Sequence, residues 1–293
     1  MNLFCQTINN ITTPLSRSEI DQLLNKTYKK FLFRPFIRAI QDYQLIKEGD
    51  HIGVCLSGGK DSLVLALLFM ELKKHHLMEF ELSFICMDPG YSSENLSLLE
   101  ANAKSLEIPL IIRKSNFFHV VEKIASSNPC YLCARMRRGF LYALGKELGC
   151  NKIALAHHFN DVIETTLLNM FYGGQFKTMV PKIKSKNFAG MELIRPLIYV
   201  KEEDIRRFIT KANLTCLNCG CTVAAQKTAS KRHEIKQLLE NMQKNDPNIL
   251  TSIFNSATNV VVDATMGYTK NGKKYQFSDI YQDNINYQDD NEE

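Results

Sequence analysis

Short apolar runs alternate along the chain with longer segments in which apolar residues recur every three or four positions. The short runs lie at residues 51–56, 81–87, 108–113 and 152–157, and helices are predicted at 60–76, 93–106, 131–149 and 160–172. Continuous apolar strands that alternate with amphipathic helices are typical of a doubly wound parallel α/β sheet. In such sheets ligands bind beyond the carboxyl ends of the strands, so we expect the functional site there.

Helical and hairpin segments flank this alternating region. An N-terminal helix is predicted over residues 18–44, with Ser16 or Ser18 as its N-cap and with Pro35 kinking or breaking it. A hairpin is expected within residues 182–200. The α/β region is therefore expected to carry an N-terminal helix and further elements beyond its fourth strand.

The net charge of +5 conceals an asymmetry along the chain. Residues 276–293 hold six acidic residues and no Lys or Arg, so a disordered acidic tail is expected there. The remainder is strongly basic, which favours a polyanionic partner such as nucleic acid. In the N-terminal helix basic residues recur every four positions, at Lys26, Lys30, Arg34 and Arg38.

The sequence contains no recognisable membrane or export signal. No apolar run approaches the ~20 residues that a membrane span needs, and the N-terminus lacks a basic region followed by an apolar one. We therefore expect a cytoplasmic protein with no membrane partner. In that setting nine cysteines indicate thiols or metal ligands rather than a disulfide framework.

The stretch SGGKDS at residues 57–62 follows the first apolar run and opens a helical one. Two glycines let the backbone approach a ligand closely, and the N–H groups of the next helix point at it, so a polyphosphate is the expected guest. The Walker A pattern does not fit, because Gly59 intervenes before Lys60 and Asp61 stands where the magnesium-binding hydroxyl belongs. The loop instead resembles the pyrophosphate loop of the N-type ATP pyrophosphatases.

Cysteines form two groups that lie far apart in the sequence. Cys130 and Cys133 stand at the start of a predicted helix, and the second group comprises Cys216, Cys219 and Cys221. Pairs of this spacing suit tetrahedral zinc or an iron–sulfur cluster, and the spacing alone leaves both open. A redox disulfide is less favoured, because no thioredoxin-like context surrounds either pair.

Polar residues at the ends of three predicted strands are expected to meet in one crevice. Ser57 ends the first strand, Asp88 the second and the His157–His158 pair the fourth. Asp88 could instead be a simple turn residue, and the histidines could be a packing pair. Arg137 follows the first cysteine pair on the same predicted helix and could clamp a phosphate.

Several motifs together resemble the tRNA 2-thiocytidine biosynthesis (TtcA) family, over about three quarters of the chain. They are VCLSGGKDS at 54–62, CYLCARMRRG at 130–139, ALAHHFNDVIETTLLNMFYGG at 154–174, IRPL at 194–197 and CLNCG at 216–220. The resemblance implies a PP-loop ATPase fold and the ATP- and magnesium-dependent replacement of the C2 oxygen of cytidine 32 in tRNA by sulfur. It also implies a [4Fe-4S] cluster held by three cysteines.

The resemblance assigns roles to individual residues. The cluster ligands fall on Cys130, Cys133 and Cys219, and Cys221 is an extra thiol where the family usually has Ser. From the chemistry of the loop and the strand ends, the expected nucleotide-binding residues are Ser57, Gly58, Gly59, Lys60, Asp61, Ser62 and Asp88, with Asp61 also a ligand of Mg²⁺. The catalytic residues fall on Lys60, Arg137 and Asp161. Asn160 replaces the first of two aspartates that the family carries in this motif.

The resemblance also suggests how the chain is organised and what it meets. Residues 1–45 form a basic helical segment, 46–215 the PP-loop ATPase domain, 216–265 a cysteine-containing C-terminal helical segment and 266–293 the acidic tail. The expected partners are tRNA and a cysteine desulfurase or other sulfur donor, and a homodimer stays open. Two alternatives remain: a PP-loop enzyme acting on another tRNA position or a small molecule, and a non-catalytic iron–sulfur protein that binds RNA.

Overall fold

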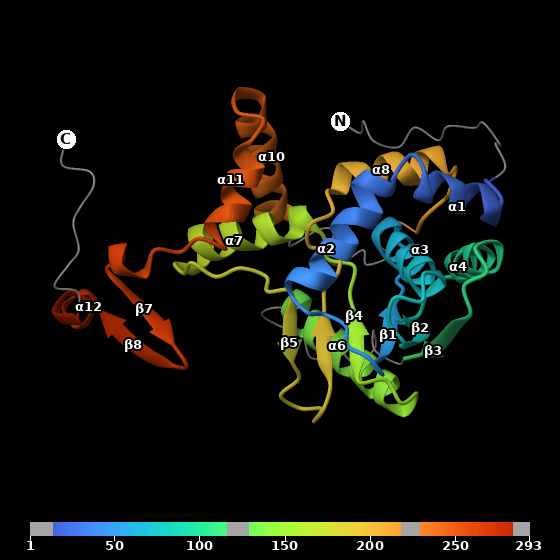
Figure 1. The fold of residues 1–293 in the computed structure, drawn as a ribbon, viewed down its shortest axis with the longest axis horizontal. Helices are drawn as coiled ribbons and strands as arrows, with labels where there is room; N and C mark the ends of the chain where they lie inside the picture. The colour runs from blue at the N-terminus through green and yellow to red at the C-terminus, as the bar shows by residue number, and fades with distance from the viewer. Residues whose placement is uncertain (1–13, 116–128, 218–228, 284–293) are drawn as a thin grey trace. The chain divides into compact units, whose positions relative to one another are not determined.

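A computed structural model of the chain describes residues 14–115, 129–217 and 229–283, with no side chains described for 129–134, 229–230, 280 and 282–283 (Figure 1). The chain divides into two compact units, Met1–Asn241 and Met242–Glu293. The four segments suggested by the sequence stay a proposal. No helix in the described ranges is long and apolar enough to cross a membrane.

A six-stranded sheet forms the centre of the first unit (Figure 1). Its strands are β1 (His51–Cys55), β2 (Glu81–Asp88), β3 (Leu110–Lys114), β4 (Lys152–Ala154), β5 (Lys182–Lys184) and β6 (Glu192–Ile194). Their order is β3-β2-β1-β4-β6-β5; β5 runs antiparallel to β6, and the other neighbouring strands are parallel. The predicted parallel α/β sheet is confirmed, and so is the hairpin, which joins β5 to β6. The strand order reverses at β1 and β4, where a crevice is expected.

Helices bury both faces of this sheet. The helical elements of the first unit are α1 (Arg17–Asn25), η1 (Lys29–Phe33), α2 (Arg34–Asp42), α3 (Lys60–Lys74), α4 (Ser93–Ser105), α6 (Pro129–Glu147), α7 (Phe159–Gly173), α8 (Glu202–Lys211) and most of α10 (Ala229–Asn245). Neighbouring strand residues point to opposite faces, yet Val54 is 0% exposed and Cys55 only 7%. Both faces are therefore covered, as a doubly wound sheet requires.

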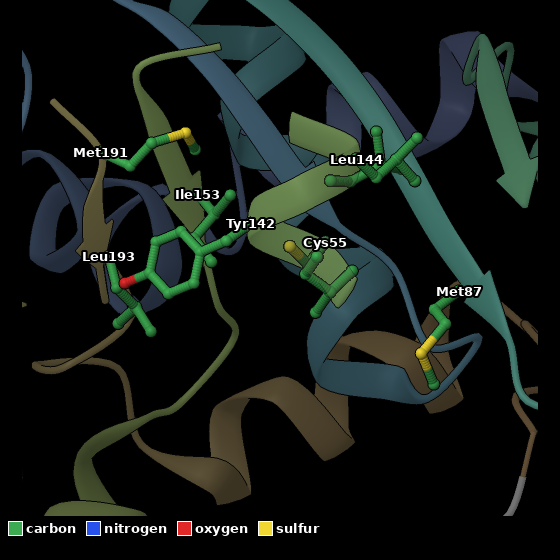
Figure 2. Close-up of a cluster of buried hydrophobic side chains, with 9 residues drawn as sticks. Cys55, Met87, Tyr142, Leu144, Ile153, Met191 and Leu193 are labelled. Atoms are coloured by element: carbon green, nitrogen blue, oxygen red, sulfur yellow. The ribbon is translucent and has the colours of Figure 1, made fainter. Parts of the chain in front are cut away.

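A hydrophobic core lies between α6 and the sheet, and β1, β2, β4 and β6 all contribute residues to it. In Figure 2, Tyr142 and Leu144 of α6 lie against Cys55 of β1 and Ile153 of β4. Leu193 of β6 belongs to the same buried cluster. This packing fixes where α6 runs across the sheet, and with it the position of the arginines that the helix carries.

The predicted N-terminal helix is divided into three pieces. Ser16 caps α1 in a capping box with Glu19, which confirms one of the two proposed N-caps. The chain then forms the π-helical turn η1 before α2, which has Pro35 in its first turn. Proline lacks an N–H and its ring crowds the preceding turn, so a widened turn just before it relieves both problems.

The second unit corrects the expectation of a disordered tail from residue 266. It contains the end of α10, α11 (Ile249–Ser256), η2 (Val262–Ala264), β7 (Gly267–Lys270), β8 (Lys273–Gln276) and α12 (Phe277–Asp283). Asn271 and Gly272 have φ of 52° and 81° and make the turn between β7 and β8, across which the rings of Tyr268 and Tyr275 stack at 4.8 Å. Asn-Gly between alternating residues is a hairpin signal that the acidic composition obscured. Residues 284–293 lie outside the described ranges.

Candidate active site

The loop at residues 57–62 joins β1 to the first turn of α3. Gly59 is the N-cap of α3 and has no side chain to bond the N–H groups of that turn, so they are left for a ligand. Ser62 shapes the loop: its hydroxyl accepts from the Ser57 N–H at 3.1 Å and donates to the Gly59 carbonyl at 2.8 Å. Ser62 is buried, whereas Ser57 is exposed and can meet a ligand directly.

Gly58 brings a distant segment onto this loop. Its φ is +76°, and a Cβ atom built there would lie 2.4 Å from Cδ1 of Leu217. The Leu217 N–H donates to the Gly58 carbonyl at 3.0 Å. The residues that lead into the second cysteine group therefore pack directly on the phosphate-binding loop, a contact that the sequence does not reveal.

Lys60 and Asp61 begin α3 and belong to a network of charges. The Lys60 ammonium lies 3.0 Å from an oxygen of Asp61 and 3.1 Å from an oxygen of Glu202. Burial lowers the pKa of Lys60, but the two carboxylates raise it further, so the lysine stays charged. The other oxygen of Asp61, Oδ1, is buried and has no hydrogen-bond partner in the described part of the chain. Sequence reasoning missed Glu202, whose only sign was an acidic first turn in α8.

Asp161 stands in the first turn of α7. Its Oδ2 accepts the N–H of His158 at 3.0 Å, and its Oδ1 lies 3.1 Å from the Arg232 guanidinium. Burial raises the pKa of Asp161, but His158, His157 and Arg232 lower it by more, so the carboxylate is ionised. Neighbouring Asn160 accepts the N–H of Glu202 at 3.0 Å and so caps α8. An aspartate there could accept the same bond, so the replacement keeps this contact.

Ion pairs, together with contacts of the His158 ring to two carboxylates, close into a ring of alternating basic and acidic groups beside the loop. Buried Glu164 of α7 pairs with Arg232 at 2.7 Å and Lys236 at 3.5 Å, both on α10. Lys236 also reaches Glu202 at 3.8 Å. The ring runs through Lys60, Glu202, Lys236, Glu164, Arg232, Asp161, His158 and Asp61, with the His158 ring 3.5 Å from Asp161 and 3.7 Å from Asp61. It ties α3, α7, α8 and α10 to one another.

A cavity of about 490 Å³ opens beside this ring, within the size range of small-molecule sites. Ser57, His157 and Asp161 line it, so the predicted meeting of the β1 and β4 ends is present. Its charged lining is dominated by arginines: Arg137, Arg138, Arg195 and Arg232. Such a lining suits a ligand with several negative charges.

Asp88 lies beside this cavity and orders its wall. The buried carboxylate accepts the N–H groups of Gly90 and Tyr91 at 2.8 and 2.7 Å, which is the turn role considered for it from the sequence. The Tyr91 hydroxyl then donates to the Ser57 carbonyl at 3.2 Å, and Pro89 and Tyr91 line the cavity. Asp88 thus shapes the end of β2 next to the phosphate loop.

The proposed cluster ligands lie mostly beyond what the structure describes. Cys219 and Cys221 fall outside the described residues, and the side chains of Cys130 and Cys133 are not described, although both belong to the first turns of α6. Cys216 is described: burial raises the pKa of its thiol to about 11, so it is protonated at neutral pH. Among described residues no group of three or more His, Cys, Asp or Glu could hold a metal ion.

Comparison with known proteins places the chain in a family. A family model described as a PP-loop domain matches residues 21–218. The chain is 36% identical over 270 residues to a tRNA-cytidine(32) 2-sulfurtransferase of Paraburkholderia phytofirmans, a match covering 90% of this chain and 78% of that protein. The chain belongs to the tRNA-cytidine(32) 2-sulfurtransferase family, within the PP-loop proteins. A second family member, from Pelobacter propionicus, is 37% identical over 76% of this chain and 83% of its own length.

A solved structure shares the fold of this member of the tRNA-cytidine(32) 2-sulfurtransferase family. It is the U34-tRNA thiolase NcsA from Methanococcus maripaludis with its [4Fe-4S] cluster, with a TM-score of 0.62 and 22% sequence identity. The match covers 82% of this chain and 79% of that one. At this identity the likeness concerns the fold, and it agrees with the PP-loop assignment.

The Gly58 contact can be tested with a pair of alanine variants. Gly58→Ala should lower the free energy of unfolding by about 2 kcal/mol or more, because it adds strain at positive φ and a clash with Leu217. Gly59→Ala is the matched control for stability, since its Cβ would lie 3.5 Å from the nearest atom and its φ is −75°. Urea unfolding followed by circular dichroism measures both. Equal losses would contradict the proposed contact.

The surroundings of His157 predict that the free energy of unfolding depends on pH. Burial, with help from Arg195, lowers the pKa of this histidine to about 4 in the folded protein, from its ordinary value of 6.5. The unfolded chain therefore takes up a proton first as pH falls, and stability declines between about pH 6.5 and pH 4, by at most about 2 kcal/mol at pH 5.

Urea unfolding at pH 7 and pH 5 tests this decline. The difference between the two pH values should shrink in His157→Gln and persist in the control His76→Asn, whose histidine is exposed. An unchanged difference in His157→Gln would assign the acid sensitivity to other groups.

Proposed function

We propose that this protein uses ATP to activate the C2 oxygen of cytidine 32 in tRNA and replaces that oxygen with sulfur. The observation that carries the proposal is the cavity itself, where a PP-loop, the carboxylate of Asp161 and four arginines converge in a chain of this family. The family relatives are named for this reaction. The geometry suits an anionic nucleotide and an anionic nucleic acid.

The loop is the proposed binding site for the ATP phosphates. The backbone N–H groups of Gly58 and Gly59 and the Ser57 hydroxyl would donate to phosphate oxygens, and Lys60 would neutralise part of their charge. Ser62 and Asp88 support this arrangement by holding the loop and the neighbouring turn. Glu202 holds the Lys60 ammonium in position from the side of α8.

Asp61 is the proposed protein ligand of Mg²⁺. Its buried Oδ1 has no hydrogen-bond partner among the described residues, which leaves a hard oxygen donor for a cation. Mg²⁺ usually takes one or two carboxylates and completes its shell with water and phosphate oxygens, so a three-residue protein site is not needed. When bound, the ion would neutralise phosphate charge. Asp161 would help to position the reacting groups.

The proposed chemistry has two displacements. The cytidine C2 oxygen attacks the α-phosphorus of ATP, forming an O–P bond while pyrophosphate leaves with its bonding electrons. This converts the oxygen into part of a good leaving group. Sulfide then attacks C2, and AMP departs with the original oxygen. Lys60 and Arg137 would stabilise the charge that grows on the phosphate oxygens, and Arg137 has a buried Nε without a hydrogen-bond partner among described residues.

Cys130, Cys133 and Cys219 are the proposed ligands of a [4Fe-4S] cluster. Three thiolates suit such a cluster and leave one iron without a protein ligand, where the group would supply bound sulfide for the second displacement. One observation supports the location: α6 runs from Cys130 and Cys133 to Arg137, which lines the cavity one turn later.

tRNA is the proposed nucleic-acid substrate, with a cysteine desulfurase or another donor supplying sulfur. Lys26, Lys30 and Arg34 are exposed on the N-terminal helical segment, where they can meet phosphates of the tRNA backbone. Arg38 is engaged locally, pairing with Asp42 at 3.2 Å and lying over the Tyr199 ring. Recognition would therefore rest on charge and shape more than on base-reading side chains.

The reaction can be tested on purified components. Anaerobically prepared protein, ATP, Mg²⁺, a sulfide source and unmodified tRNA should yield 2-thiocytidine at position 32, detected by mass spectrometry of tRNA digests. Lys60→Ala should lower the rate at least a hundredfold, because it removes a cation next to the phosphates. Arg207→Ala, an exposed change on α8, serves as control. Product at another position, or none from wild-type protein, would refute the proposal.

The third cluster ligand can be decided between two neighbouring cysteines. Cys219→Ala should lose the broad visible absorption of a [4Fe-4S] protein, whereas Cys221→Ala should keep it, because only Cys219 completes the proposed three-thiolate set. Iron and sulfide analysis of the two anaerobically purified variants provides a second readout. The opposite pattern would make Cys221 the ligand.

A further inference from the structure

Arg195 is a buried cation without a carboxylate partner. Arg195 is 5% exposed and directly follows β6 in the chain. The backbone N–H of Arg195 donates to the Pro181 carbonyl at 2.9 Å, and Nη1 of its side chain donates to the Val180 carbonyl. Its Nε is buried and has no hydrogen-bond partner among the residues that the structure describes. The guanidinium is thus held firmly and only partly satisfied.

The surroundings do not balance this charge. Within the described ranges no Asp or Glu forms an ion pair with Arg195, and Asp161 is already engaged by Arg232 and His158. Burial and the nearby cation of Arg138 lower the pKa of Arg195 to about 10, although Tyr142 and Asp161 act in the opposite direction. A buried charge is costly unless an opposite charge meets it, so a ligand that brings negative charge to Arg195 is favoured.

The position of Arg195 indicates which ligand that is. Arg195 lines the same cavity as Ser57 and Asp61 of the loop. β1 and β6 both neighbour β4, so about 10 Å separates their ends, a gap that a triphosphate and an arginine side chain can bridge together. The planar guanidinium offers paired N–H donors that match phosphate oxygens.

We propose that Arg195 binds a phosphate group of the nucleotide and that this phosphate is its missing counter-ion. The inference rests on the proposed function, since it places the nucleotide in the same cavity. It adds a binding residue from the strand next to β4, on the opposite side of the crevice from the loop. The side chain contacts ligand directly and needs neither tRNA nor sulfur for that contact.

The test compares Arg195→Met with the wild-type protein. Methionine has a similar length and no charge, so the variant should bind Mg·ATP at least tenfold more weakly in isothermal titration of the full chain without tRNA. Without ligand its thermal midpoint should be equal to or higher than that of wild type, because an unbalanced buried charge has gone. Arg207→Met is the control, since that exposed arginine pairs with Glu203 and Asp204 on α8.

Further titrations identify which phosphate Arg195 contacts and separate this inference from the proposed function. AMP and pyrophosphate, titrated in place of ATP, show which part of the nucleotide loses affinity, and Arg195→Lys should regain part of the ATP affinity. Equal ATP binding by Arg195→Met and wild type overturns the inference, as does a variant that fails to fold. Unchanged ATP binding with weakened tRNA binding also overturns it, because Arg195 would then contact a phosphate of the tRNA. Wild-type protein that binds no ATP refutes the proposed function itself.

Discussion

The packing of Leu217 against Gly58 is the contact on which the arrangement of the site depends. Leu217 is buried with Cys86 and Leu99, so the hydrophobic core anchors it, and its N–H bonds the Gly58 carbonyl. Burial of one leucine is worth about 2 kcal/mol, enough to hold a chain segment in place. Because Gly58 has no Cβ, the segment lies directly on the loop. The phosphate-binding motif and the approach to the second cysteine group thereby become one site.

The ring of ion pairs is the second constraint on this site. Glu164 is buried and would be costly there without Arg232 and Lys236, so ion pairs hold α10 against α7. Lys60 in turn is shared between Asp61 and Glu202. Much of the charge of these groups is thus balanced within the protein. Arg137 and Arg195 line the cavity and each has a buried Nε without a hydrogen-bond partner among the described residues, so they offer positive charge to a polyanion.

Asn160 shows how a departure from a family motif can keep a structural contact. Its side-chain oxygen accepts the first N–H of α8, a bond that either asparagine or aspartate can make. The residue that faces the ring and the cavity is Asp161. The single carboxylate of the HHFND motif is therefore the one that lines the cavity.

Sequence alone is enough to predict the parallel sheet, the loop after β1 and the family, because alternating periodicity and contiguous motifs are local properties. It also indicated the Ser16 cap, and its Asn271–Gly272 pair could have shown the β7–β8 hairpin. It could not show that Glu202, Glu164 and Arg232 join Asp61 and Asp161, or that Leu217 meets Gly58. Those residues are distant in sequence and ordinary in type. Their contacts follow from the tertiary structure, because burial and charge balance depend on which side chains the fold brings within a few ångströms of one another.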